Sequence, residues 1–532
     1  MSRRVIETDV CIVGSGISAA MVAEKLAETR TCRITVIEAG DESDPLGTRA
    51  ALRRRYLDYG ESPWRNDHID GCDVPGMQSR SMQVGGLAMH WGGVTPRWTP
   101  EDFRLRSLYG VHEDWPISYE DLDPFYLEAE QRLGVAGEPG PADLDARSAP
   151  YPQPPLPLTY NLGLLKQWVA DAGVRMWSQP SAKNAVPWRG RPPCCRNDTC
   201  FPVCPIGAKY SPDFTWNALR RDRLVELLPR TVIRRLETGP DARIVRAVGV
   251  SRDRPDEELE FRAGTFVVAA GYLWSAHLLL NSRSARYPDG LANRSGTVGK
   301  FLAGHRNVNA FVDLPLELFP GQNEQHSLVT TQFMRVPAGP AYRRHDLRVW
   351  ESSFGQGPRF LDDTGRLLLG DDLLTDWRAR TAPGRARIRS YYDVIPDRHS
   401  EVTLSPDRRT PWGDPLPVLA WRDAEVSRNG REPTEAAIRT LFERLARSGG
   451  GKILSVRSDP FQDHPAGGCR MGADPASSVT DGWGRCHDHE NLFVVGAPTC
   501  VSASCANGTL TFAALSLRAA DAIGRAFPIR SR

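Results

Sequence analysis

The chain has 532 residues, which is too many for one ordinary hydrophobic core, so two or three domain-sized units are expected. Hydrophobic residues at 40% and charged residues at 25% exclude wholesale disorder. The 67 basic and 65 acidic side chains give a formal net charge of only +2, so the chain has no strong field for binding nucleic acid.

No segment resembles a membrane span or an export signal. The longest apolar run, residues 266–280, is shorter than the roughly 20 residues that cross a bilayer. The first residues lead directly into an apolar strand, without the hydrophobic region and cleavage site of a signal peptide. We therefore expect a cytoplasmic protein; the alternatives are export or attachment to a membrane through a partner subunit.

The first predicted elements are a strand at residues 8–13, a glycine-rich turn and a helix. This order is what a dinucleotide phosphate site requires. Gly14 makes the tight turn, Gly16 lets the backbone approach the pyrophosphate, and Ala19 allows the helix to pack closely on the strand. The amides at the start of the helix then face the phosphates. The predicted cofactor-binding residues of this segment are Gly14, Gly16, Ser18 and Ala19.

A second strand, residues 33–37, ends in Glu38, about 20 residues after the glycine-rich turn. An acid at this position can accept hydrogen bonds from a ribose. The alternative is a loop within an ordinary βαβ unit, but the glycine pattern together with Glu38 favours a dinucleotide site.

Four of the eleven cysteines crowd into one loop, residues 191–209, at Cys194, Cys195, Cys200 and Cys204. Thiolates this dense can hold an iron–sulfur cluster, bind zinc or pair as disulfides. Zinc is disfavoured because adjacent cysteines are awkward ligands for one tetrahedral ion. A cluster, disulfides and free thiols remain open.

Two further buried strands are predicted far along the chain, at residues 265–271 and 491–496. Helical stretches follow at 274–280 and 509–523. A cofactor domain assembled from the first, middle and last parts of the chain suits a flavoprotein better than a compact nicotinamide domain. The cofactor-binding candidates at the end of the middle strand are Ala270 and Gly271.

Residues 305–425 contain no chemical motif. The alternation at residues 385–395 predicts a sheet strand. Arginines and acids in this region are expected on solvated faces. Because the motifs lie elsewhere, we expect substrate specificity to reside here.

Seven segments in this order resemble the glucose-methanol-choline (GMC) family of FAD-dependent oxidoreductases. They are the Gly14 turn with Glu38 and residues 85–91, 115–126, 269–271, 464–472, 478–481 and 506–511. Residues 485–493 and 204–209 are similar to a bacterial branch that includes the flavoprotein subunits of fructose, gluconate and sorbitol dehydrogenases. Paromamine-type aminoglycoside hydroxyl oxidases are similar in general plan.

The resemblance implies an α/β fold with a discontinuous, Rossmann-like FAD-binding domain. A mixed α+β substrate-binding or lid domain on a mostly antiparallel sheet is implied beside it. The FAD-binding domain would comprise residues 1–110, 225–305 and 465–532, and the substrate domain residues 111–224 and 306–464, with the cysteine loop 191–209 in the latter.

The resemblance also implies the chemistry, the oxidation of an alcohol to an aldehyde or ketone. The hydroxyl proton must leave as hydride moves to the flavin, so a neutral base must lie within reach of the oxygen. By resemblance, His464 is that base and Asn507 its partner. The alternatives are a capping or core histidine and an asparagine that caps the helix; capping can accompany the catalytic role of Asn507.

The remaining implied flavin contacts flank this pair. Gly85 and Gly86 permit close approach to the isoalloxazine ring. His90 stands where some members tether their flavin covalently, the alternative being a noncovalent contact or packing on Trp91. The helix that begins near residue 508 aims its free amides at the flavin. The family often has proline where this chain has Gly508, and the implied contacts there are Gly508 and Thr509.

The implied substrate is a carbohydrate-like alcohol: a sugar, amino sugar or polyol. Electrons would leave to dioxygen or to a separate electron carrier. The alternative function is a flavoprotein subunit of a membrane-attached sugar dehydrogenase. In that case Cys194, Cys200 and Cys204 would hold a three-iron cluster on the path to a cytochrome.

Overall fold

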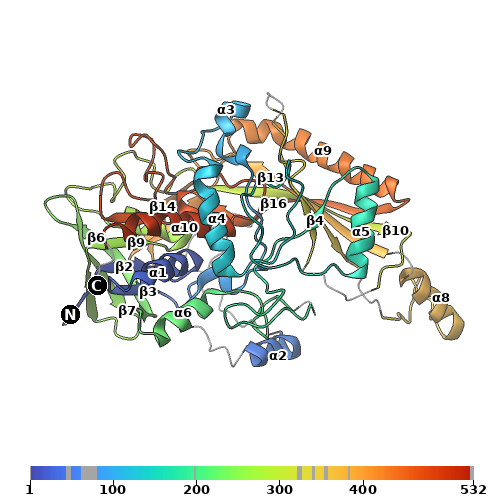
Figure 1. Cartoon of the computed structure of the whole chain (residues 1–532), viewed down its shortest axis with the longest axis horizontal. Coiled ribbons are helices and arrows are strands. Elements are labelled where there is room, and N and C mark those ends of the chain that lie inside the picture. Colours follow the sequence, from blue (N-terminus) through green and yellow to red (C-terminus); the bar gives the residue numbers. More distant parts are fainter. Residues whose placement is uncertain are drawn as a thin grey trace.

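The structure is a computed structural model (Figure 1). It describes residues 2–42, 49–60, 81–196, 199–319, 326–337, 342–352, 357–381 and 384–527. Two large sheets organise the chain. A parallel sheet with its helices occupies one end of the molecule, and an antiparallel sheet occupies the other (Figure 1).

The parallel sheet has five short strands in the order β17-β9-β2-β3-β5. Their bounds are β2 Val10–Val13, β3 Ile34–Ile37, β5 Val225–Leu228, β9 Thr265–Val268 and β17 Leu492–Val494. Every residue of β2, β3, β9 and β17 is buried, as expected for a parallel sheet covered on both faces. The predicted strands at residues 8–13, 33–37, 265–271 and 491–496 are thereby confirmed.

Helices α1 (Ile17–Thr29) and α10 (Thr509–Gly524) pack against each other on this sheet, and α4 (Tyr119–Leu133) packs on α10. Small side chains make the close approach possible, because Ala19, Ala20 and Ala23 of α1 are fully buried. Helix α7 (Gly271–Asn281) packs against β6 (Thr231–Thr238) and against the hairpin of β14 (Glu401–Arg409) and β15 (Pro415–Ala420). The first and last helices of the cofactor region therefore share one core.

Smaller sheets flank this core. Strands β1 (Ser2–Glu7), β8 (Glu257–Arg262), β7 (Ile244–Ser251) and β6 (Thr231–Thr238) form a four-stranded sheet in that order. Strands β14 (Glu401–Arg409) and β15 (Pro415–Ala420) form a separate hairpin.

The antiparallel sheet has six strands in the order β16-β10-β13-β12-β11-β4. Their bounds are β4 Trp177–Ser178, β10 Ala303–Leu314, β11 Leu328–Thr330, β12 Leu347–Glu351, β13 Gly384–Val394 and β16 Lys452–Ala466. Helices α5 (Tyr160–Asp171) and α9 (Glu425–Ser448) share a hydrophobic core with one face of this sheet. The alternation at residues 385–395 correctly predicted a strand, β13.

Four further helices complete the described elements: α2 Arg49–Tyr59, α3 Leu105–Tyr109, α6 Pro212–Arg221 and α8 Gly370–Thr381. Within the described part of the chain, none of the helices has the length and apolar character that crossing a bilayer requires.

Candidate active site

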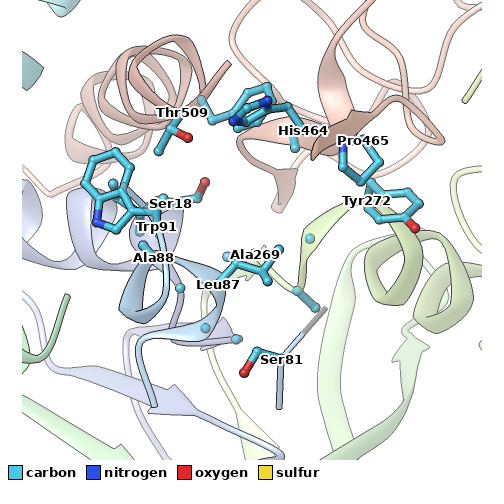
Figure 2. A pocket seen from close by; sticks show the side chains of 18 of the residues that line it. Ser18, Ser81, Leu87, Ala88, Trp91, Ala269, Tyr272, His464, Pro465 and Thr509 are labelled. Atoms are coloured by element: carbon cyan, nitrogen blue, oxygen red, sulfur yellow. The ribbon is translucent and has the colours of Figure 1, made fainter. Parts of the chain in front are cut away.

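A cavity of about 900 Å³ is lined by residues of both large sheets. The first turn of α1, residues 86–94 and the starts of α7 and α10 contribute its cofactor side. Strands β12, β13 and β16 contribute the other side. Figure 2 shows Ser18, Trp91, Ala269, His464 and Thr509 arranged around this space.

The turn between β2 and α1 has the shape that a bound pyrophosphate requires. Gly14 has φ +101°, and a Cβ there would lie 2.5 Å from the carbonyl oxygen of Ala269. Gly16 instead has no neighbouring atom within 4 Å of its Cβ position, so its backbone is open to the cavity. Ser15 donates to the Glu38 carboxylate from its backbone N–H (3.0 Å) and its hydroxyl (2.6 Å). An open glycine before a helix start, with a buried acid beside it, fits the phosphates and ribose of FAD.

Most of the predicted cofactor-binding residues line the cavity; they are Gly14, Gly16, Ser18, Glu38, Gly86, His90, Trp91, Ala270, Gly271 and Thr509. Three do not. Ala19 is fully buried in α1, where it serves helix packing. Gly85 donates its N–H to the Ser15 hydroxyl, and Gly508 leaves room for the Phe512 ring, which would lie 2.5 Å from a Cβ at 508.

His90 lies at the edge of this space with its ring in polar company. Its Nε2 is 2.9 Å from Nε2 of Gln83 and 3.3 Å from the hydroxyl of Ser81. Trp91, the next residue, donates its indole N–H to the carbonyl oxygen of Tyr210 at 2.8 Å, and this hydrogen bond fixes the indole ring.

His464 and Asn507 come from distant parts of the chain and meet in the cavity. His464 lies near the end of β16, and Asn507 lies just before α10. Nδ2 of Asn507 is 3.0 Å from Nε2 of His464. The expectation that Asn507 also caps the helix is wrong: Gly508 holds the N-cap position, and the carboxamide is turned toward His464 and Arg348.

The hydrogen-bond network fixes the protonation of the His464 ring. The Arg348 guanidinium can only donate, so the Asn507 atom that faces it is the carboxamide oxygen. The Asn507 amide therefore donates to Nε2 of His464, which must carry a lone pair. The ring proton then lies on Nδ1, 3.2 Å from Nε2 of His305.

His305 is held as a neutral acceptor beneath this pair. It is fully buried on β10, and the centre of its ring lies 4.1 Å from that of Tyr391, with the two rings tilted by 31°. Burial lowers the pKa of His305 well below its usual value, and the positive charges of Arg389 and Arg348 lower it further. The pairing of β10 with β16 shifts register on both sides of His305, as bulges near functional sites do.

The expectation that arginines of residues 305–425 lie on solvated faces is wrong for the site. Arg348 is 2% exposed, and it lines the cavity together with Arg387, Arg389 and Tyr391. Alternation along β12 and β13 turns these side chains to one face of the sheet. The alternating sequence at residues 385–395 indicated that Arg387 and Arg389 share one face of a strand. It did not indicate whether that face is exposed to solvent or lines a cavity.

The cysteine loop reaches this cavity through Phe201, but its four cysteines do not line it. Cys194, Cys195, Cys200 and Cys204 line a second, small cavity, and all ten cysteines of the described residues are free. Within the described ranges, no group of three or more His, Cys, Asp or Glu side chains is arranged to hold a metal ion. Two buried lysines, Lys183 and Lys209, lie close to these thiols, and burial lowers the pKa of Lys209 to about 8.

Comparison with known proteins identifies the family. A model of the GMC oxidoreductase family matches residues 396–516. The fructose dehydrogenase large subunit of Gluconobacter japonicus is 31% identical, over 98% of this chain and 99% of that protein. The chain belongs to the GMC oxidoreductase family. Paromamine 6'-oxidase of Streptomyces fradiae is 29% identical to this GMC oxidoreductase, over 97% of this chain and 91% of that protein.

Solved structures share the GMC fold. Pyridoxine 4-oxidase from Mesorbium loti superposes with a TM-score of 0.61 at 18% identity, covering 97% of this chain and 99% of that one. The predicted fold class is confirmed. As a GMC oxidoreductase, the protein is an FAD-dependent enzyme that acts on CH–OH groups.

Proposed function

We propose that the enzyme oxidises a hydroxyl of a carbohydrate-like alcohol (a sugar, amino sugar or polyol) to an aldehyde or ketone, with His464 as the base. The observation that carries this proposal is the contact of 3.0 Å between His464 Nε2 and Asn507 Nδ2, beside the start of α10 in the cavity. The names of the relatives, a fructose dehydrogenase and a paromamine oxidase, support the substrate class.

When bound, FAD would supply the two-electron acceptor for the hydride that leaves the carbon bearing the hydroxyl. The chain's own residues handle the proton. The substrate hydroxyl enters between His464 and Asn507, donates to Nε2 of His464 and accepts from Nδ2 of Asn507. His464 takes that proton and holds it while its Nδ1–H donates to His305. Arg348 keeps the Asn507 carboxamide in the orientation that this step needs.

The test is the variant His464→Ala. The change removes the base but lies outside the phosphate turn, so the purified variant keeps its FAD and yellow colour. We expect anaerobic flavin reduction by the substrate to slow by about 100- to 10,000-fold. The control is His399→Gln, a change at an exposed histidine, which should reduce flavin at the parent rate. Reduction of the His464→Ala flavin at nearly the parent rate would refute the base.

The attachment of FAD at His90 belongs to the same proposal. Its support is that the His90 ring lines the cavity and is oriented by Gln83 and Ser81. Acid precipitation separates the alternatives: a yellow pellet indicates a covalent bond, and a colourless pellet indicates noncovalent binding.

A second candidate function is the flavoprotein subunit of a sugar dehydrogenase complex, with electrons leaving through an iron–sulfur cluster. It is supported by the likeness to a protein named as a large subunit and by four thiols on one small cavity near two buried lysines. Among the described residues, no three His, Cys, Asp or Glu side chains are arranged to hold a metal ion, so the presence of a cluster must be measured directly. Iron and acid-labile sulfide in the purified holoenzyme would support this candidate, and flavin without iron would favour transfer to dioxygen or to another carrier.

A further inference from the structure

The side of the cavity formed by the antiparallel sheet carries an unusual concentration of positive charge. Arg348 on β12 and Arg387 and Arg389 on β13 all line it. The strand register places Arg348 directly opposite Arg389, and Trp350 opposite Arg387. Like charges directly opposite each other on one sheet face are destabilising unless something compensates them.

Arg387 donates from Nε and Nη2 to Oδ1 of Asn309. Asp346 pairs with Arg348, with Oδ2 at 2.9 Å from Nε, and its other oxygen accepts the backbone N–H of Tyr391. One carboxylate therefore faces two guanidinium groups. Among the described residues that line the cavity, the only carboxylate is Glu38, which is bound to Ser15 in the phosphate turn.

Arg389 is held in place by aromatic rings. Its guanidinium lies 3.9 Å from the centre of the Tyr391 ring and 4.8 Å from that of Trp350. Its Nε is buried and has no hydrogen-bond partner. Stacking fixes the plane of a guanidinium and leaves its edge for an anion with two oxygens that accept parallel N–H bonds, as carboxylate and phosphate groups have.

This charge lies next to the reacting pair. Tyr391, under Arg389, packs on His305, and its ring centre is 6.5 Å from that of His464. Arg348 donates to Asn507 itself. An anion bound at Arg389 would therefore belong to the same small molecule whose hydroxyl meets His464.

We propose that Arg389, supported by Arg348 and Arg387, forms an anion subsite, and that the substrate is an alcohol that carries a carboxylate or phosphate group. This inference rests on the proposed function and narrows it, because a cavity lined by one sign of charge concentrates the opposite sign. Sugar acids and sugar phosphates fit the subsite. Cationic amino sugars do not, since their ammonium groups would face the guanidinium groups.

The experiment has a binding arm that needs no turnover. The FAD-loaded enzyme is titrated with succinate and, separately, with inorganic phosphate, and binding is followed through the flavin spectrum. Neither probe carries an oxidisable hydroxyl. Arg389→Gln should weaken binding of the preferred anion by about 10- to 100-fold, as expected when a charged hydrogen-bonding partner is lost. Arg389→Lys keeps the charge and should weaken it less. The two probes distinguish a carboxylate site from a phosphate site.

The turnover arm compares matched alcohols: D-gluconate, D-glucose 6-phosphate, D-glucose and D-glucosamine. We expect the anionic alcohol of the preferred type to have the highest kcat/KM, and Arg389→Gln to lose that preference mainly through KM. Equal oxidation of neutral or cationic alcohols, together with anion binding that Arg389→Gln leaves unchanged, overturns the inference and leaves the proposed function intact.

The remaining outcomes are also decisive. Anion binding that depends on Arg389 without flavin reduction by any alcohol supports the subsite and contradicts the proposed function. If Arg389→Gln alters the flavin spectrum or potential but not anion binding, Arg389 serves the flavin and the inference is wrong.

Discussion

His464 has a backbone φ of +70°, in the left-handed region that residues other than glycine rarely adopt. Such a conformation costs about 1–3 kcal/mol and persists only where the surroundings enforce it. Here Ala466, two residues on, is paired with Ala303 of β10, and the His464 ring is hydrogen-bonded at both nitrogens. The strain sets the imidazole against Asn507, where the proposed chemistry needs it.

The hydrogen bond between His305 and His464 can be tested by substitution of His305. His305→Phe keeps the packing on Tyr391 but removes the acceptor for Nδ1–H of His464, so the ring loses its fixed orientation. We expect kcat to fall by about tenfold, the equivalent of one hydrogen bond, with FAD retained. The acid limb of the kcat/KM profile should move to lower pH, because the protonated form of His464 loses a partner.

His305→Gln is the matched variant for this prediction. Its side-chain oxygen can accept from His464, so part of the lost rate should return. A purely structural role would lower the melting temperature without moving the pH profile, and that result would contradict the positioning role of His305.

The sequence and the structure agree well on residues that belong to a contiguous motif. The motifs around His464 and Asn507 predicted two side chains that the structure brings to 3.0 Å. Arg348, Arg389 and His305 were missed, because each gains its role from a register across strands that are distant in the chain. A sequence shows alternation within one strand but not which residue of another strand lies opposite.

The turn between β2 and α1 contains two glycines, Gly14 and Gly16, whose replacement by alanine should have different effects. Gly14→Ala places a Cβ 2.5 Å from the Ala269 carbonyl oxygen and in a left-handed conformation, so the fold itself should be destabilised. Gly16→Ala adds its methyl group to open space at an ordinary φ of −65°. It should therefore fold normally and lose only FAD affinity, because the methyl group occupies the approach to the pyrophosphate.

The measurement is thermal unfolding of the two apo variants, followed by titration with FAD. We expect the Gly14→Ala midpoint to drop by several degrees, the Gly16→Ala midpoint to stay at the parent value, and only the parent to bind FAD tightly. Tight FAD binding by Gly16→Ala would show that the pyrophosphate lies elsewhere.

The strands of the parallel sheet were predictable because each is a short apolar run bounded by turn residues. The antiparallel sheet was only partly predictable, since β10, β12 and β16 mix charged and apolar residues and depend on partners that are distant in sequence. The proposed domain boundaries stay a prediction.

At the scale of the whole molecule, buried neutral histidines make stability depend on pH. Burial lowers the pKa of six of them, to about 4 for His112 and His345 and to about 3 for His326; the others are His277, His305 and His489. In the unfolded chain these groups take up protons below about pH 6.5, whereas in the folded chain they do so only at lower pH. Stability should therefore fall as pH drops from 6.5 toward 4.

Each such group contributes on the order of 3 kcal/mol to this loss when its pKa falls to about 4. Chemical unfolding at a series of pH values measures the slope. His326→Gln, which can keep a hydrogen bond to Ser178, should make the slope shallower. Constant stability between pH 6.5 and 4 would contradict the prediction.

The side chains of His464 and Asn507 belong to different halves of the molecule. His464 lies near the end of the long strand β16 of the antiparallel sheet, whereas Asn507 precedes α10, which packs on α1 beside the parallel sheet. The distance between their side chains therefore depends on how the two halves of the molecule pack against each other. A small rotation of one half against the other would part the imidazole from the carboxamide without altering either residue, so substitutions far from the cavity can silence the enzyme by loosening that packing.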